Sequence, residues 1–127
     1  AGLVAITAEP LTPGPILAMC LGSIGAVIMY FGTKFLESQA LDDVVGAIPV
    51  HMFAGIFGTL VVPLSNNDTN FVTQLTGVIS VCVFSFVLSY AVFRTLKETI
   101  GLRISKSAER LGTDKAEVGV SAYSIRD

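Results

Sequence analysis

The stretch of sequence that decides the fold covers residues 69–93 and reads TNFVTQLTGVISVCVFSFVLSYAVF. It contains no charged residue, and Asp68 and Arg94 bound it on either side. A helix of about 20 apolar residues is long enough to cross the hydrocarbon core of a bilayer. The stretch therefore predicts a membrane-spanning helix.

Two more charge-free stretches precede it, residues 10–33 and residues 44–67. Proline is well tolerated at the first position of a helix, so the first of these helices is expected to begin near Pro15. The second is expected to end near Pro63, because the polar residues 65–69 favour a turn. Three such stretches predict an all-α membrane protein built as a polytopic helical bundle.

Charge is distributed unevenly along the 127 residues. Only 14% of them are charged, against roughly a quarter in an average soluble domain, and 12 of the 18 charged residues lie from Arg94 onward. This pattern excludes a water-soluble globule, and the lack of a basic run gives no sign of a nucleic-acid partner. Seven of the eight Lys and Arg residues follow Phe93, which predicts a cytoplasmic C-terminus and a multi-pass protein of the cell membrane. We expect residues 1–98 to form the transmembrane part and residues 99–127 a cytoplasmic tail.

The opening residues Gly2–Thr7 are apolar and favour the last turns of a helix whose beginning is missing, so the chain is expected to be a piece of a larger protein. Small residues let membrane helices approach one another closely. Those that we expect at helix contacts are Ala18, Gly22 and Ala26 in the first span and Ala54, Gly55 and Gly58 in the second.

One side chain inside the spans titrates in the ordinary physiological range, and it is His51. Counted from Val44, it is expected about 10 Å into the membrane from the cytoplasmic side. An imidazole there is costly unless it has a partner or a purpose. It both donates and accepts hydrogen bonds, which suits a proton relay or a ligand for a small polar solute. The alternative is a histidine satisfied by a neighbouring helix.

Three nearby residues bear on His51. Asp42 and Asp43 precede the second span, where a carboxylate caps free N–H groups or attracts a cation to an inner mouth. Pro49 is expected inside the helix, where it cannot donate to the carbonyl of Val45 and disfavours a straight path. The chain has no metal-ligand set, no paired intramembrane carboxylates and no phosphate-binding loop, so we expect no enzymatic activity, no catalytic residue, no metal and no cofactor.

Two groups of residues resemble the ammonium transporter/Rh family. The first resembles the penultimate helix of the family and consists of Asp42-Asp43, His51, Gly55 and Gly58. The second resembles its cytoplasmic C-terminal signature and consists of Thr99-Ile100-Gly101-Leu102-Arg103, Glu109-Arg110, Gly112, Asp114, Gly119 and Ala122-Tyr123. Residues 2–7 are similar to the end of the eighth helix of the family.

The resemblance implies a partial ammonium transporter fold: the end of helix eight, helices nine to eleven and the tail of an eleven-helix protomer that forms a homotrimer in the bilayer. It implies that His51 is the second of two pore histidines, that Ala47 and Ile48 form the apolar wall, and that Thr7 lies near the pore. Neutral ammonia would pass after ammonium loses a proton. In the tail it implies a regulatory role, including docking of P-II-type signalling proteins, for Gly101, Arg103, Asp114 and Tyr123.

The sequence departs from the family beside the histidine. Gly46 replaces an Asp, Ile48 replaces an aromatic residue, and Pro49 and Met52 replace glycines, which predicts a narrower pore. Val118 and Val120 replace the usual His and Glu of the tail signature. These departures favour one alternative, an ammonium-sensing receptor that binds the ion without conducting it, with a fused cytoplasmic signalling domain. A separate alternative is a structural membrane subunit with a packed histidine.

Overall fold

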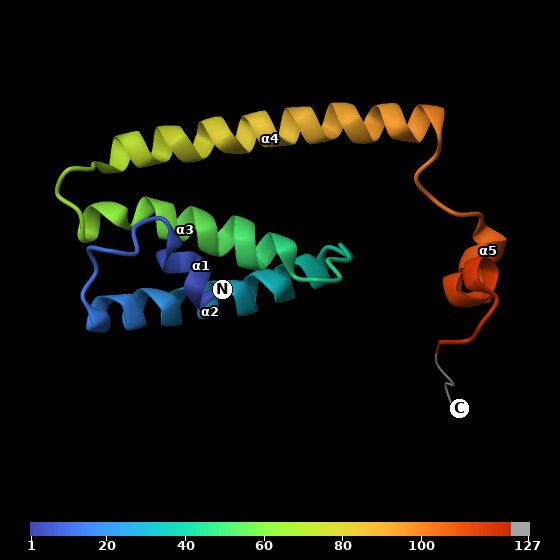
Figure 1. The fold of residues 1–127 in the computed structure, drawn as a ribbon, viewed down its shortest axis with the longest axis horizontal. Helices are drawn as coiled ribbons and strands as arrows, with labels where there is room; N and C mark the ends of the chain where they lie inside the picture. The colour runs from blue at the N-terminus through green and yellow to red at the C-terminus, as the bar shows by residue number, and fades with distance from the viewer. Residues whose placement is uncertain (123–127) are drawn as a thin grey trace. The chain divides into compact units, whose positions relative to one another are not determined.

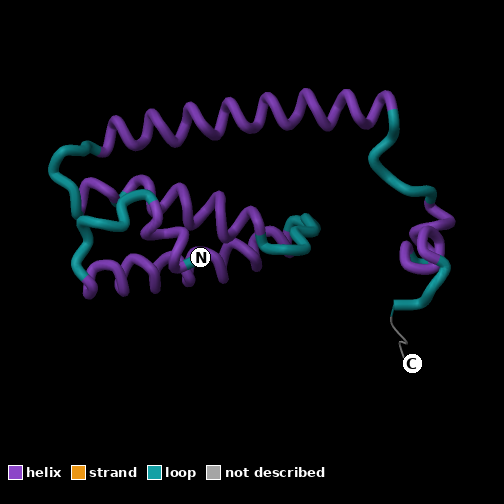
Figure 2. Tube along the Cα trace, viewed as in Figure 1, coloured by secondary structure: helices purple, strands orange, loops and turns teal. Residues whose placement is uncertain are grey.

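The computed structural model describes residues 1–122, and every regular element in that range is a helix (Figure 2). The elements, labelled in Figure 1 where there is room, are α1 (Gly2–Thr7), α2 (Pro15–Ser38), the π-helix η1 (Ile48–Phe53), α3 (Ala54–Leu60), the 3-10 helix η2 (Val62–Leu64), α4 (Phe71–Thr99), α5 (Lys106–Leu111) and the π-helix η3 (Asp114–Val118). The predicted all-α fold is confirmed. The chain forms two compact units, residues 1–83 and residues 84 onward, and the division falls within α4.

Two of the three predicted spans are helices long and apolar enough to cross a membrane, namely α2 and α4. The middle one is shorter, because helical structure there covers Ile48–Leu64. The expectation of a helix from Val44 onward is wrong. Gly46 adopts a left-handed conformation with φ +68°, which ends the turn before it and lets the helix start only afterwards.

Helix α2 begins and ends for local reasons. Pro15 is its first residue, as predicted, and its fixed φ suits that position. At the other end, the amides of Ala40 and Leu41 donate to the carbonyls of Glu37 and Leu36, each over 3.0 Å. Ala40 holds φ +54° to make this C-terminal motif, a conformation that is usually given to glycine. The helix therefore continues past Lys34 and ends at Ser38.

In the first unit, α1 lies in the angle between α2 and α3 and contacts both (Figure 1). Ala5 of α1 is only 1% exposed. A Cβ added at Gly25 of α2 would lie 2.5 Å from the Cβ of Ala5, and one added at Gly58 of α3 would lie 2.5 Å from its carbonyl oxygen. Two glycines therefore let two helices close onto one alanine.

The buried face of α2 differs from the predicted one. Its members recur at intervals of four and seven residues, which keeps them on one side of a helix, and they are Leu21, Gly25, Gly32 and Leu36. Of the predicted set, Gly22 approaches the backbone of Gly2, whereas Ala26 is exposed. In the second predicted set, Ala54 and Gly58 are buried and Gly55 is partly buried.

Helix α4 presents its side chains outward, since none of its 29 residues is buried. Its exposed side chains are nevertheless mostly large and apolar, as in a helix whose surroundings are lipid or other protein.

Candidate functional site

The candidate site is centred on His51, which belongs to η1. His51 lies three residues after Ile48, the first residue of η1, and Val44 lies in a turn before this helix. The predicted depth of His51 in the membrane stays a prediction. The imidazole occupies the first turn of this helical segment.

Asp43 and Pro49 explain why η1 begins where it does. The carboxylate of Asp43 accepts hydrogen bonds from the amide of Ile48 (2.7 Å) and the amide of Ala47 (2.9 Å). These bonds, the one from Ile48 foremost, hold the pKa of Asp43 below its usual value. Pro49 follows directly and has no N–H to donate, so the first turn loses nothing by its presence. Asp42 is exposed beside this cap.

The turn that carries His51 is wider than an α-helical turn. The amide of Ala54 donates both to the carbonyl of His51 and to that of Pro49, five residues earlier. Such π-helical segments are rare and are frequent at functional sites.

Gly32 of α2 anchors η1 from one side. Pro49 is fully buried, and a Cβ added at Gly32 would lie 3.1 Å from the Cβ of Pro49. The same added atom would lie 2.5 Å from Cδ2 of Phe53. Pro49 therefore packs against α2, and the narrowing of the pore stays a prediction. Met52, the residue after His51, is 49% exposed.

His51 is exposed, and within residues 1–122 its imidazole has no hydrogen-bond partner. Ala47 is exposed and Ile48 is 37% exposed, and both precede His51 by no more than four residues in the sequence, so their role in the site stays a prediction. Thr7 ends α1, and its hydroxyl donates to the carbonyl of Leu3 over 2.7 Å.

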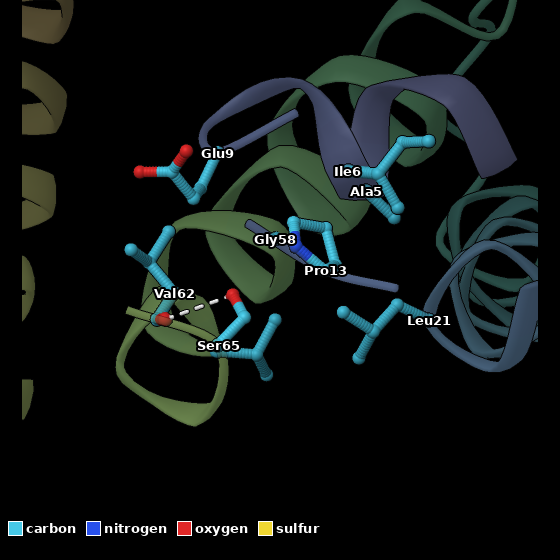
Figure 3. Close-up of a pocket in the computed structure, with 9 residues that line it drawn as sticks. Ala5, Ile6, Glu9, Pro13, Leu21, Gly58, Val62 and Ser65 are labelled. Atoms are coloured by element: carbon cyan, nitrogen blue, oxygen red, sulfur yellow. Dashed lines mark hydrogen bonds between the residues drawn. The ribbon is translucent and has the colours of Figure 1, made fainter. Parts of the chain in front are cut away.

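A small hollow lies between α1 and the end of α3 (Figure 3). Its lining residues are Ala5, Ile6, Glu9, Pro13, Leu21, Gly58, Val61, Val62 and Ser65. At its rim the side-chain amide Nδ2 of Asn66 donates to the carboxylate of Glu9 over 2.9 Å. The volume of about 10 Å³ suits one water molecule, and none of the predicted pore residues lines the hollow.

The tail residues singled out in the sequence have local structural partners. Gly101, at φ +86°, donates to the carbonyl of Leu96 just beyond the end of α4. Arg103 forms an ion pair with Glu109, which raises the pKa of the guanidinium.

Beyond α5, the carboxylate of Asp114 accepts the amide of Ala122 over 2.7 Å. This bond, more than those from nearer amides, lowers the pKa of Asp114. Tyr123 lies outside the described residues.

The sequence did not reveal that Gly32 and Phe53 lie in contact near His51. The available signal was the interval of seven residues from Gly25 to Gly32, which marks one helix face more faithfully than the four-residue spacing that was used. No comparable signal marks Phe53, because its role depends on a neighbour on another helix.

Comparison with known proteins places the whole described chain in one family. A model described as Ammonium Transporter Family matches residues 1–123. The ammonium transporter Amt2 of Archaeoglobus fulgidus is 36% identical, with 97% of this chain and 31% of that protein covered. Amt1 of Methanocaldococcus jannaschii is 30% identical, with 98% of this chain and 34% of that protein covered.

A further relative, Amt1 of Haloferax mediterranei, is 34% identical, with 97% of this chain and 25% of that protein covered. The chain thus spans a quarter to a third of the length of these relatives. Its long apolar helices fit a membrane protein. It belongs to the ammonium transporter family.

Proposed function

We propose that this chain supplies one histidine, His51, to a hydrophobic pore through which ammonium nitrogen crosses the membrane as ammonia. The observation that carries the proposal is the position of His51 in a chain of this family. Its imidazole is exposed, while Pro49 and Phe53 on either side of it are packed against α2.

The cost of moving a charge into an apolar pore favours ammonia over ammonium as the species that crosses. Moving a bare ammonium ion into a low-dielectric pore is costly, whereas neutral ammonia enters at a small fraction of that cost. Ammonium releases a proton at the pore entrance, an imidazole carries the proton, and ammonia takes one up on the far side. His51 has both ring nitrogens available for this exchange, and Ile48 adds apolar surface beside it.

The remaining parts of the proposal concern orientation and assembly. The Lys and Arg residues that follow Phe93 support a cytoplasmic C-terminus. We propose a homotrimer, in line with the family resemblance, whose tail docks P-II-type proteins through residues around Arg103 and Asp114. Asp43 caps the helix near the inner mouth, and Thr7 lies at the pore lining.

The test is an ammonium-evoked current on a solid-supported membrane, carried by the protein as its gene encodes it. His51→Ala should lower the current about tenfold or more, or admit potassium. His51→Gln keeps the hydrogen-bonding capacity but cannot carry a proton, so it should bind ammonium and conduct poorly. Gly77→Ala is the matched control, because an added Cβ there meets no atom within 4 Å.

An unchanged current and selectivity in His51→Ala would remove the histidine from the mechanism. Saturable ammonium binding without any wild-type current would replace the pore by the sensor. No observation on the described residues now favours that alternative.

A further inference from the structure

We propose that Gly32 of α2 is a positioning residue for His51 and acts through Pro49 and Phe53. The inference rests on the proposed function of His51, but it concerns a different helix and a contact that involves no substrate.

The contact leaves no room for a side chain. A Cβ added at Gly32 would lie 2.5 Å from Cδ2 and 3.0 Å from Cε2 of Phe53, and 3.1 Å from the Cβ of Pro49. Non-bonded carbon atoms are most favourably separated by about 3.5–4.0 Å. Any residue other than glycine at position 32 therefore displaces part of η1.

The two residues in contact respond differently to such a displacement. The ring of Phe53 is able to turn away about its side-chain torsions. The Cβ of Pro49 is fixed to the main chain by the pyrrolidine ring, so relief there requires the backbone of η1 to move. His51 lies between these two anchors, and the wide turn that connects them transmits the movement to the imidazole.

Gly32 is distinctive among the described glycines in making its tight contacts with η1. Gly25 and Gly58 approach Ala5 of α1 instead. An added Cβ at Gly22 would lie 3.5 Å from the nearest atom, which is an ordinary contact distance. Gly22 and Gly32 belong to the same helix, so Gly22→Ala controls for the general effect of alanine in α2.

The test compares Gly32→Ala, Phe53→Ala, the double variant and Gly22→Ala in the protein as its gene encodes it. The first measurement is the rate at which diethyl pyrocarbonate modifies His51, followed by mass spectrometry of the peptide that carries it. The second is the ammonium-evoked current. Gly32→Ala should change the modification rate severalfold and lower the current, and Gly22→Ala should change neither. Phe53→Ala, which removes one anchor, should also change the rate, and in the double variant the two effects should partly cancel.

A correctly folded Gly32→Ala protein with the wild-type modification rate would overturn the inference. If Gly32→Ala does not fold, Phe53→Leu decides, because it trims the ring without adding atoms, and an unchanged rate at His51 contradicts the positioning role. The modification rate does not depend on transport. A wild-type protein without ammonium current would therefore refute the proposed pore while leaving the positioning measurement intact.

Discussion

Helices α2 and α4 are both long and apolar enough to cross a membrane, yet they differ in how many of their residues are buried. Four residues of α2 are buried, and two of these are glycines in close contact with neighbouring helices. No residue of α4 is buried, and an atom added at its glycine, Gly77, would meet nothing. In α2, therefore, two glycines lie at the close contacts with neighbouring helices, so small residues mark where this helix packs.

The largest effect is expected from Gly58→Ala, because Gly58 of α3 lies directly against the main chain of Ala5 in α1. The added Cβ would lie 2.5, 2.8 and 2.9 Å from the oxygen, carbonyl carbon and Cα of Ala5. These are main-chain atoms, so no rotamer change relieves the clash, and overpacking of about 3 kcal/mol or more is expected. Thermal unfolding followed by size-exclusion chromatography in detergent should show a lower midpoint or loss of folded protein. Gly77→Ala should behave like the wild type, and equal effects at both positions would refute the contrast.

Gly25→Ala should destabilise less, by about 1–3 kcal/mol, and should be partly rescued by a second change. Here the opposing atom at 2.5 Å is the Cβ of Ala5, which Ala5→Gly removes. The Gly25→Ala/Ala5→Gly double variant should therefore recover part of the lost unfolding midpoint, while the carbonyl oxygen of Ala1, 3.1 Å from the added Cβ, keeps the recovery incomplete. Ala5→Gly should not rescue Gly58→Ala, because that clash is with the main chain. Rescue of both, or of neither, would contradict the geometry.

Acid should weaken the cap at Asp43. Hydrogen bonds in the folded state hold its pKa below the usual value of an aspartate side chain. Its contribution to stability is therefore present above that usual value and is lost as the pH falls through the lowered folded-state pKa. Asp43→Asn should consequently lose less stability than the wild type over the same fall in pH, measured as unfolding midpoints across a pH series. Asp42→Asn, which alters the exposed carboxylate beside the cap, is the matched control. Parallel pH profiles for Asp43→Asn and the wild type would exclude a role of the cap.

The smallest effect concerns the end of α2. Ala40→Gly removes the cost of a left-handed alanine and should stabilise the protein by a few tenths to about 1 kcal/mol after the entropy of the unfolded glycine is subtracted. Gly46→Ala, at φ +68°, should act in the opposite direction. The two unfolding midpoints should move apart, and a shift of the same sign in both variants would contradict this account.

The sequence predicted the features that local preferences of single residues set. It missed those that depend on an unusual backbone conformation or on a contact with another residue. Pro15 fixed the start of α2 correctly because the preference of proline for the first helical turn is local. The end of α2 was missed because Ala40 adopts a left-handed conformation, which the sequence does not predict for an alanine. The start of η1 was missed because Val44 and Val45 continue an apolar run, whereas Gly46 and the carboxylate of Asp43 set the boundary.

The candidate site divides in the same way. His51 was singled out because an imidazole in an apolar span is chemically conspicuous, and its role stays a prediction. The contact of Pro49 with Gly32 joins residues on different helices, so neither propensity nor spacing revealed it. The buried face of α2 was misplaced for the same reason, since Gly25 matters only because Ala5 faces it.

The contact between Ala5 and Gly25 has a consequence for how sequences of this kind vary. The space between these two residues accommodates one methyl group, and α1 is the better helix to carry it, because a Cβ on Gly25 would also lie 3.1 Å from the carbonyl oxygen of Ala1. We therefore expect relatives to keep small residues at both positions 5 and 25. Position 58, which faces main chain, is expected to stay glycine.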